Sequence, residues 1–250
     1  MTEPGSSIIE LRRYALHPGA RETLIELFER EFVETQEAVG IRVLGTFRDA
    51  DDPDSFVWIR GFTGMPARAR ALQAFYGGPA WAEHSEAANA TMVDVDNVLL
   101  LRPVDQASRL ALDTSRRPPA RTSAPARGVV SVTVCPLEPG HAPAFSELFD
   151  REIEPALRQA GGGVRARFVT EHSENTFPAL PVREGEEVFV WLSLFADERA
   201  RSEHAAAIDL AALLGEHLDG APQTLRLEPT PRSLLPDEAA GGPGRGAAHR

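Results

Sequence analysis

Charged and aromatic side chains alternate with aliphatic ones along two predicted strands, and their types suit them to bind a small organic molecule. One strand places Glu10, Arg12 and Tyr14 on a single face, and the other places Trp58 and Arg60 on a single face. An arginine can anchor a carboxylate or an enolate, and a tyrosine can pass a proton. We therefore expect these five side chains to line a ligand site.

A second group of candidate side chains lies in the tract FYGGPAWAEH, residues 75–84. Trp81 and His84 are three residues apart on a predicted helix and so share one face, with Tyr76 just before the Gly-Gly break. All three are predicted to bind ligand, and His84 joins Tyr14 as a catalytic candidate. The structural alternative is a hydrogen-bonded histidine between helix and sheet, which an aligned His217 in the second half favours.

Metal and thiol chemistry have weaker support in the sequence. Asp94, Asp96 and Asn97 could join His84 around a metal ion, but no HxH or HExxH spacing is present. Cys135 aligns with Tyr14 when the two halves of the chain are overlaid, and so falls on the corresponding strand face. It has no histidine near it in sequence. We therefore predict no metal and no cofactor.

The composition excludes several functional classes. All 26 residues counted as Lys+Arg are arginine, so Schiff-base catalysis, a pyridoxal-phosphate anchor and a P-loop lysine are excluded. A net charge of −11 argues against a nucleic-acid partner and against an anionic membrane surface. With no membrane span, no leader-like start and a single cysteine, the sequence predicts a cytoplasmic protein, and homo-oligomerisation is left open.

An internal duplication organises the chain. Residues 8–32 return as residues 129–153, so that the Pro-Gly turn and the Glu-Leu-Phe triplet recur at one constant offset of 121 residues. The Phe-Val-Trp triplet recurs at an offset of 133, which places extra residues in the loop HSENTFPALPVREGEE. Strands are predicted at 8–16, 41–48, 56–62 and 95–102.

The predicted fold class is α+β, with two ferredoxin-like β-α-β-β-α-β repeats packed sheet to sheet as a pseudo-dimeric α/β barrel. The predicted divisions are an N-terminal tail (1–7), a first repeat (8–103), a Pro/Arg-rich linker (104–127), a second, divergent repeat (128–231) and a disordered tail (232–250).

Overlaying the copies predicts which strand face points where. The aliphatic set that includes Ile9 and Leu11 is expected to pack beneath the helices. The face with Glu10, Arg12 and Trp58 is expected to close onto its counterpart, because exposed aromatic surface costs roughly 25 cal/mol per Å². This places the ligand site in the barrel interior, an idea that fails if that interior is packed solid.

Four stretches resemble the NIPSNAP family of the dimeric α/β-barrel superfamily. They are ELRRYALHPGA at 10–20, ELFERE at 26–31, FRDADDPDSFVWIRGF at 47–62 and AFYGGPAWAEHSEAANATMVDVDNVLLLRP at 74–103. The resemblance implies two ferredoxin-like repeats and a largely undefined function, with no catalytic residues to carry over. The second half retains the Pro-Gly turn, ELFDRE and FVWLSLF but lacks FYGGPAW, so a site using that tract exists once per chain.

Three functional hypotheses remain open. In the first, the protein binds or acts on a small organic molecule in the barrel interior. In the second, the duplicated barrel is a non-catalytic binding or assembly module. In the third, suggested by relatives in the wider superfamily, it is an oxidoreductase that uses either haem, held by His84 or His217, or no cofactor.

Overall fold

Both halves of the chain fold through the same succession of elements. The computed structural model describes residues 5–122, 124 and 127–236. The first half comprises β1 (Ile8–Leu16), α1 (Arg21–Leu27), the π-helical turn η1 (Phe28–Phe32), α2 (Val33–Ala38), β2 (Arg42–Asp49), β3 (Ser55–Phe62), α3 (Met65–Tyr76), α4 (Pro79–Asn89), β4 (Met92–Asp94) and β5 (Val98–Pro103). The linker and second half comprise η2 (Thr114–Arg116), β6 (Val129–Leu137), α5 (Ala142–Leu148), the π-helical turn η3 (Phe149–Ile153), α6 (Glu154–Gln159), β7 (Val164–Thr170), β8 (Glu187–Phe195), α7 (Glu198–Ala207), α8 (Leu210–Leu214), η4 (Gly215–His217) and β9 (Gln223–Pro229).

The repeated Pro-Gly turn delivers β1 and β6 into the helices that follow them. Gly19 has a φ of +76° and Gly140 a φ of +85°, a left-handed conformation that glycine adopts without a steric penalty. The helix after the first turn buries Leu24, Phe28 and Phe32 along one side, as their spacing predicts. Two segments far apart in sequence therefore form the same local structure.

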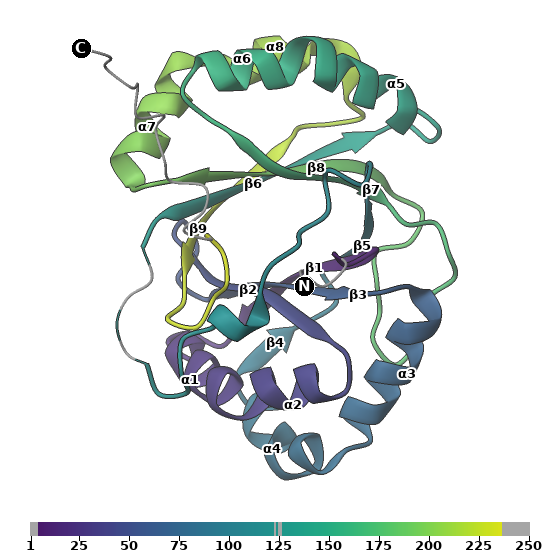
Figure 1. Ribbon diagram of the computed structural model, residues 1–250, viewed down its shortest axis with the longest axis vertical. Coiled ribbons are helices and arrows are strands. Elements are labelled where there is room, and N and C mark those ends of the chain that lie inside the picture. Colours follow the sequence, from purple (N-terminus) through teal and green to yellow (C-terminus); the bar gives the residue numbers. More distant parts are fainter. Residues whose placement is uncertain (1–4, 123, 125–126, 237–250) are drawn as a thin grey trace, which may run out of the picture.

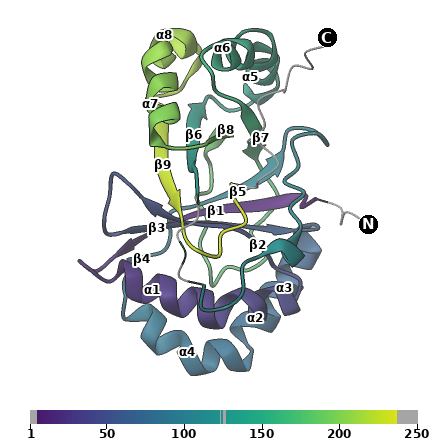
Figure 2. The same ribbon diagram turned by 60° about the vertical axis from the view of Figure 1, so that its left-hand side comes forward.

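The strands close into a barrel. Their order is β3-β2-β9-β6-β8-β7-β5-β1, and an additional β1–β3 pairing joins the two ends, while β4 pairs outside this ring with β1. The two four-stranded sheets meet where β2 pairs with β9 and where β5 pairs with β7. Helices α1–α4 cover one outer side of the barrel and α5–α8 cover the opposite side (Figures 1 and 2). The predicted fold of two ferredoxin-like units packed sheet to sheet is confirmed.

The predicted assignment of the strand faces is wrong. Ile9, Leu11, Val57 and Ile59 point into the barrel, where they form one buried apolar cluster with aliphatic side chains of β6 and β8. The face that carries Tyr14, Phe56, Trp58 and Phe62 instead packs beneath the helices of the first half. The interior expected to hold the ligand site is thus filled with apolar side chains.

The physical reason is that both faces of each sheet are buried. An eight-stranded barrel is only wide enough for its own side chains, so branched aliphatic residues from both halves fill it. Most of the aromatic rings pack in the layer between sheet and helices, whereas Phe47 and Phe168 belong to the interior cluster. Because burial on both sides makes each face apolar, alternation separates the two sets of residues without indicating which set points inward.

The linker and the segment after β9 pack against the barrel. Leu110 and Leu112 of the linker, together with Leu234 and Leu235, belong to the same apolar cluster as the barrel interior. Residues 232–236, predicted as the start of a disordered tail, are therefore ordered by burial. The remainder of that predicted tail (237–250), the start of the N-terminal tail (1–4) and linker positions 123, 125 and 126 lie outside the described residues.

Within the described residues, no helix is long and apolar enough to cross a membrane.

Candidate functional site

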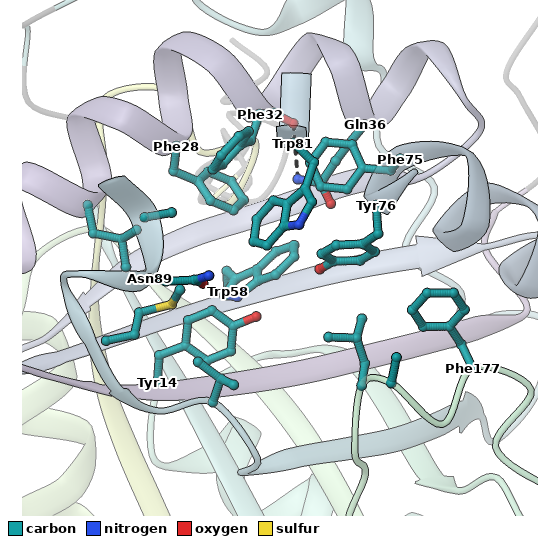
Figure 3. A pocket seen from close by; sticks show the side chains of 16 residues that line it. Tyr14, Phe28, Phe32, Gln36, Trp58, Phe75, Tyr76, Trp81, Asn89 and Phe177 are labelled. Carbon is teal, nitrogen blue, oxygen red and sulfur yellow. Dashed lines mark hydrogen bonds between the residues drawn. The ribbon is translucent and has the colours of Figure 1, made fainter. Parts of the chain in front are cut away.

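A cavity of about 350 Å³ lies between the sheet of the first half and its covering helices. Its walls are mainly aromatic, and Figure 3 shows the rings gathered around the open space. The aromatic lining residues are Tyr14, Phe28, Phe32, Trp58, Phe75, Tyr76, Trp81 and Phe177. Small-molecule sites commonly have volumes of roughly 300–1,000 Å³ and such apolar walls, so the size and lining suit a compact organic ligand.

Several elements hold the rings in fixed mutual positions. Phe28 packs on Trp58 with ring centroids 4.9 Å apart, and Tyr76 packs edge-on against Trp81 at 4.8 Å. Phe28 and Phe32 come from the π-helical turn η1, and π-helical turns are frequent at functional sites. These contacts join β3 to η1 and join α3 to α4, while Tyr14 extends the wall onto β1.

Polar groups are few along this wall, and the two tyrosine hydroxyls are the most prominent. In Figure 3 the hydroxyls of Tyr14 and Tyr76 point toward each other across the cavity, with Trp58 behind them. The indole Nε1 of Trp58 and the side-chain Oε1 of Gln36 are buried without a hydrogen-bond partner. A ligand with a few polar atoms could satisfy these groups.

Arg12 holds the hydroxyl of Tyr14 from behind the cavity. The guanidinium Nε donates a hydrogen bond to the Tyr14 oxygen at 2.9 Å. Burial raises the pKa of Tyr14 above its ordinary value of 10.0, although the charges of Arg12 and Arg60 oppose that rise. Tyr14 therefore stays protonated at neutral pH, with its oxygen occupied by Arg12 and its hydrogen available to an acceptor in the cavity.

Arg12 belongs to a buried network centred on Glu10. The antiparallel register sets Glu10 opposite Arg60 and Arg12 opposite Trp58, so the four side chains are neighbours on one face. Glu10 accepts hydrogen bonds from Arg12 and Arg68 at 2.6 Å and from Arg60 at 2.7 Å. Burial alone would raise the pKa of Glu10, but the three arginines outweigh it and hold that pKa well below its ordinary value.

A strap from the second half covers the cavity. We use this name for residues 171–186, the β7–β8 loop, which runs down to α3 (Figure 1). It matches the predicted insertion, residues 172–187, to within one residue at each end. Phe177 of the strap stacks on Tyr76, with ring centroids 5.8 Å apart. Asn175 of the strap accepts a hydrogen bond at its Oδ1 from Nη1 of Arg68 in α3, at 3.0 Å. The second half therefore contributes to this site through the strap.

The structure brings together seven of the eight predicted ligand-binding residues. Tyr14, Trp58, Tyr76 and Trp81 line the cavity, while Glu10, Arg12 and Arg60 form the network behind it. His84 does not line the cavity but lies behind Phe32, with ring centroids 6.3 Å apart, and its Nε2 is 3.3 Å from Glu31 Oε2. His217 is exposed in η4, so neither histidine considered for haem faces this cavity.

Sequence reasoning missed Arg68, Phe28, Phe32 and the strap residues. In the sequence the two phenylalanines belong to a helical apolar stripe, which is also the pattern of an ordinary core. The strap appeared only as extra length in a hairpin, with no indication of its direction. Arg68 lies in a helix whose arginines alternate with alanines, so nothing distinguished it from its exposed neighbours.

The corresponding layer of the second half is filled. Cys135, Phe149 and Trp191, the counterparts of Tyr14, Phe28 and Trp58, belong to one buried apolar cluster. Burial raises the pKa of Cys135 to about 12, so its thiol stays protonated and is a poor nucleophile. The polar network has no equivalent there, because Ser131, Thr133 and Ser193 replace Glu10, Arg12 and Arg60. The two halves therefore differ in this layer, and the cavity described above belongs to the first half.

Solved structures similar in fold to the whole chain come from several proteins. It is similar in structure to a candidate monooxygenase of Fusobacterium nucleatum subsp. nucleatum ATCC 25586, with 11% identity, 91% of this chain and 94% of that chain covered, and a TM-score of 0.57. A candidate monooxygenase of Lactobacillus acidophilus NCFM matches with 13% identity, 91% and 98% coverage and a TM-score of 0.53. An anthrone oxidase-like protein matches with 13% identity, 92% and 94% coverage and a TM-score of 0.50. At these identities the likeness establishes the fold alone.

Residues 9–107 match the model of the NIPSNAP family. The match covers the first half of the chain, and the resemblance to the NIPSNAP family seen in its sequence is confirmed. The matched segment contains β1, β3 and all four helices around the cavity, whereas the strap lies outside it. None of the curated proteins compared with the chain matches it.

Proposed function

We propose that this protein binds a small, planar and largely apolar molecule in the cavity of the first half of the chain. The observation that carries the proposal is the 350 Å³ cavity with eight aromatic side chains and a tyrosine hydroxyl fixed by a buried arginine. The rings would stack on the ligand, and Tyr14 would donate a hydrogen bond to its polar atom. A substrate of this protein would bind, and react, in the same cavity.

Two features support a ligand site over a packing defect. Protein interiors are close-packed, so a cavity of this size in a well-formed layer is unusual. The polar atoms beside it, including Trp58 Nε1 and Gln36 Oε1, lack partners that a ligand would supply. A purely structural assembly module would have no need of either feature.

Tyrosine absorbance gives a selective assay, because the chain contains only two tyrosines and both line the cavity. Ligands from a panel of bicyclic aromatic compounds should perturb that absorbance and quench the fluorescence of Trp58 and Trp81. Ala179, an exposed strap residue at the cavity edge, offers a way to block entry without disturbing the core. We expect Ala179→Trp to abolish binding, with Ala206→Trp on the exposed side of α7 as the matched control.

Two results would overturn the proposal. One is the absence of any binder in a panel that includes neutral and acidic compounds. The other is equal binding by the wild type and by Ala179→Trp, which would place the ligand elsewhere. Binding without turnover would leave the protein as a non-catalytic binding module.

Oxidation of the bound ring is a second candidate function. The candidate monooxygenases and the anthrone oxidase-like protein share the fold, and the Tyr14–Arg12 pair suits the ionised form of a phenol or enol, which is the form most easily oxidised. Oxygen consumption with a bound ligand, lost in Ala179→Trp, is the test. No oxygen uptake with any tight binder would exclude this activity.

A further inference from the structure

The network behind the cavity carries more positive than negative charge. Glu10, Arg12, Arg60 and Arg68 are all fully buried, and one carboxylate faces three guanidinium groups. These four side chains therefore hold an excess of two positive charges. Removing a charge from water without a partner costs several kcal/mol, so a protein retains such an excess only where something offsets it.

The described neighbours of the network do not neutralise this excess. Arg60 lies over Trp58 and Phe62 at 5.0 and 5.5 Å, and Arg68 bonds the neutral side chains of Asn175 and Thr176. Arg12 meets Tyr14, which keeps its proton at neutral pH as argued above. Each arginine has at least one buried nitrogen without a hydrogen-bond partner: Arg12 Nη2, Arg60 Nη1 and Nη2, and Arg68 Nη2. Of these, Arg60 Nη2 lies 2.7 Å from Glu10 Oε2 as an ion pair.

The excess charge is directly coupled to the cavity. The Arg12 guanidinium is one hydrogen bond from the Tyr14 hydroxyl and 5.6 Å from the centroid of Trp58, and both of these residues line the cavity. Around them the wall is apolar, and a positive charge acts strongly on a group held in such surroundings. The end of the cavity at Tyr14 is thus the place where an anionic oxygen would be stabilised most.

We infer that the ligand is an acid, namely a planar apolar body that bears one ionised oxygen group, held at Tyr14 by the positive network. The inference rests on the proposed function and deepens it. A carboxylate and the enolate or phenolate of a ring share this chemistry. A neutral molecule of the same shape would fill the aromatic part of the cavity and leave the charge excess without a counterion.

The wild-type protein tests the inference with matched probes. We choose 2-naphthoate, 2-naphthamide and 2-naphthol, and measure dissociation constants by quenching of tryptophan fluorescence at neutral pH. The naphthoate is expected to bind at least tenfold more tightly than the isosteric amide. The naphthol distinguishes the two sources of an anionic oxygen, because binding as the phenolate gives the absorption spectrum of its anion.

Variants then assign the effect to the network. Arg12→Gln is expected to weaken naphthoate binding at least tenfold and to change amide binding less than twofold. Arg48→Gln, which removes an arginine bonded to Glu22 on the surface, is the matched control and should alter neither. If Arg12→Gln does not fold, Arg68→Gln removes one charge from the side of the network nearer the strap. The comparison of naphthoate with naphthamide in the wild-type protein tests the inference without any variant.

The outcomes separate this inference from the proposed function. Equal affinities of acid and amide would overturn the inference and leave the cavity as a site for neutral molecules. The absence of binding by all three probes, and by the wider panel, would overturn both. Stabilisation by chloride or nitrate with no preference for the acid would assign the network to an inorganic anion and also overturn the inference.

Discussion

Glu10 is the most informative residue to perturb, because a single carboxylate holds three buried arginines. Replacing Glu10 by Gln keeps the shape and removes the charge, which leaves all three guanidinium groups without an anionic partner. Breaking a buried pair in this way costs about 3–5 kcal/mol. For a chain of this size, that loss corresponds to a fall in Tm of roughly 10 °C.

The stability of wild type and variant should be measured by urea unfolding, followed by far-UV circular dichroism, over a range of pH. Since the pKa of Glu10 is lowered in the folded state, its contribution is complete above the ordinary value of 4.5 and is lost as pH falls below it. The difference between wild type and Glu10→Gln should therefore be largest near pH 7 and shrink progressively below about pH 4.5.

A surface pair provides the matched control. Glu22 accepts two hydrogen bonds from Arg48 at 2.7 and 2.6 Å, but its side chain is 56% exposed. Glu22→Gln should cost no more than about 1 kcal/mol, as exposed ion pairs do. If Glu10→Gln costs no more than Glu22→Gln, or if the difference between the curves does not shrink in acid, the reasoning about a buried charged network is refuted.

Three further predictions concern single residues. Cys135, with a pKa of about 12, should resist an aromatic disulfide reagent in the native protein and react only after unfolding; rapid labelling of the native protein would contradict its burial. Asn175→Ala removes the acceptor for Arg68, worth about 1 kcal/mol, and should speed hydrogen exchange in the strap roughly fivefold; an unchanged rate would mean that this bond does not hold the strap. His84→Ala should change the affinity for a cavity ligand less than twofold, because His84 lies outside the lining; a larger change would restore it as a site residue.

The predicted elements of the first half show which parts of a fold are local. The strand expected at 8–16 forms Ile8–Leu16, and the strand expected at 56–62 forms Ser55–Phe62. The fourth strand, expected at 95–102, forms as β5 (Val98–Pro103), and the short β4 (Met92–Asp94) precedes the predicted range. Periodicity and turn residues specify these elements because they act over a few neighbouring positions.

The membership of the candidate site could also be predicted from sequence. Alternation along a strand placed Glu10, Arg12 and Tyr14 on one face, and the repeat made it evident that Ser131, Thr133 and Cys135 replace them in the second half. A pleated strand imposes this alternation whatever surrounds it. The sequence therefore determined which side chains lie together on one strand face and that this set occurs once in the chain.

Only the tertiary structure decided where that face points and what completes it. Both faces of each sheet are buried, so the energy of burying apolar surface does not distinguish the barrel interior from the helix side. The aliphatic side chains fit the narrow barrel. The aromatic and charged side chains of the opposite face lie beneath the helices, where they and the aromatic side chains of the helices surround a cavity. Arg68 and the strap reach it through contacts between residues about a hundred positions apart, which no local pattern encodes.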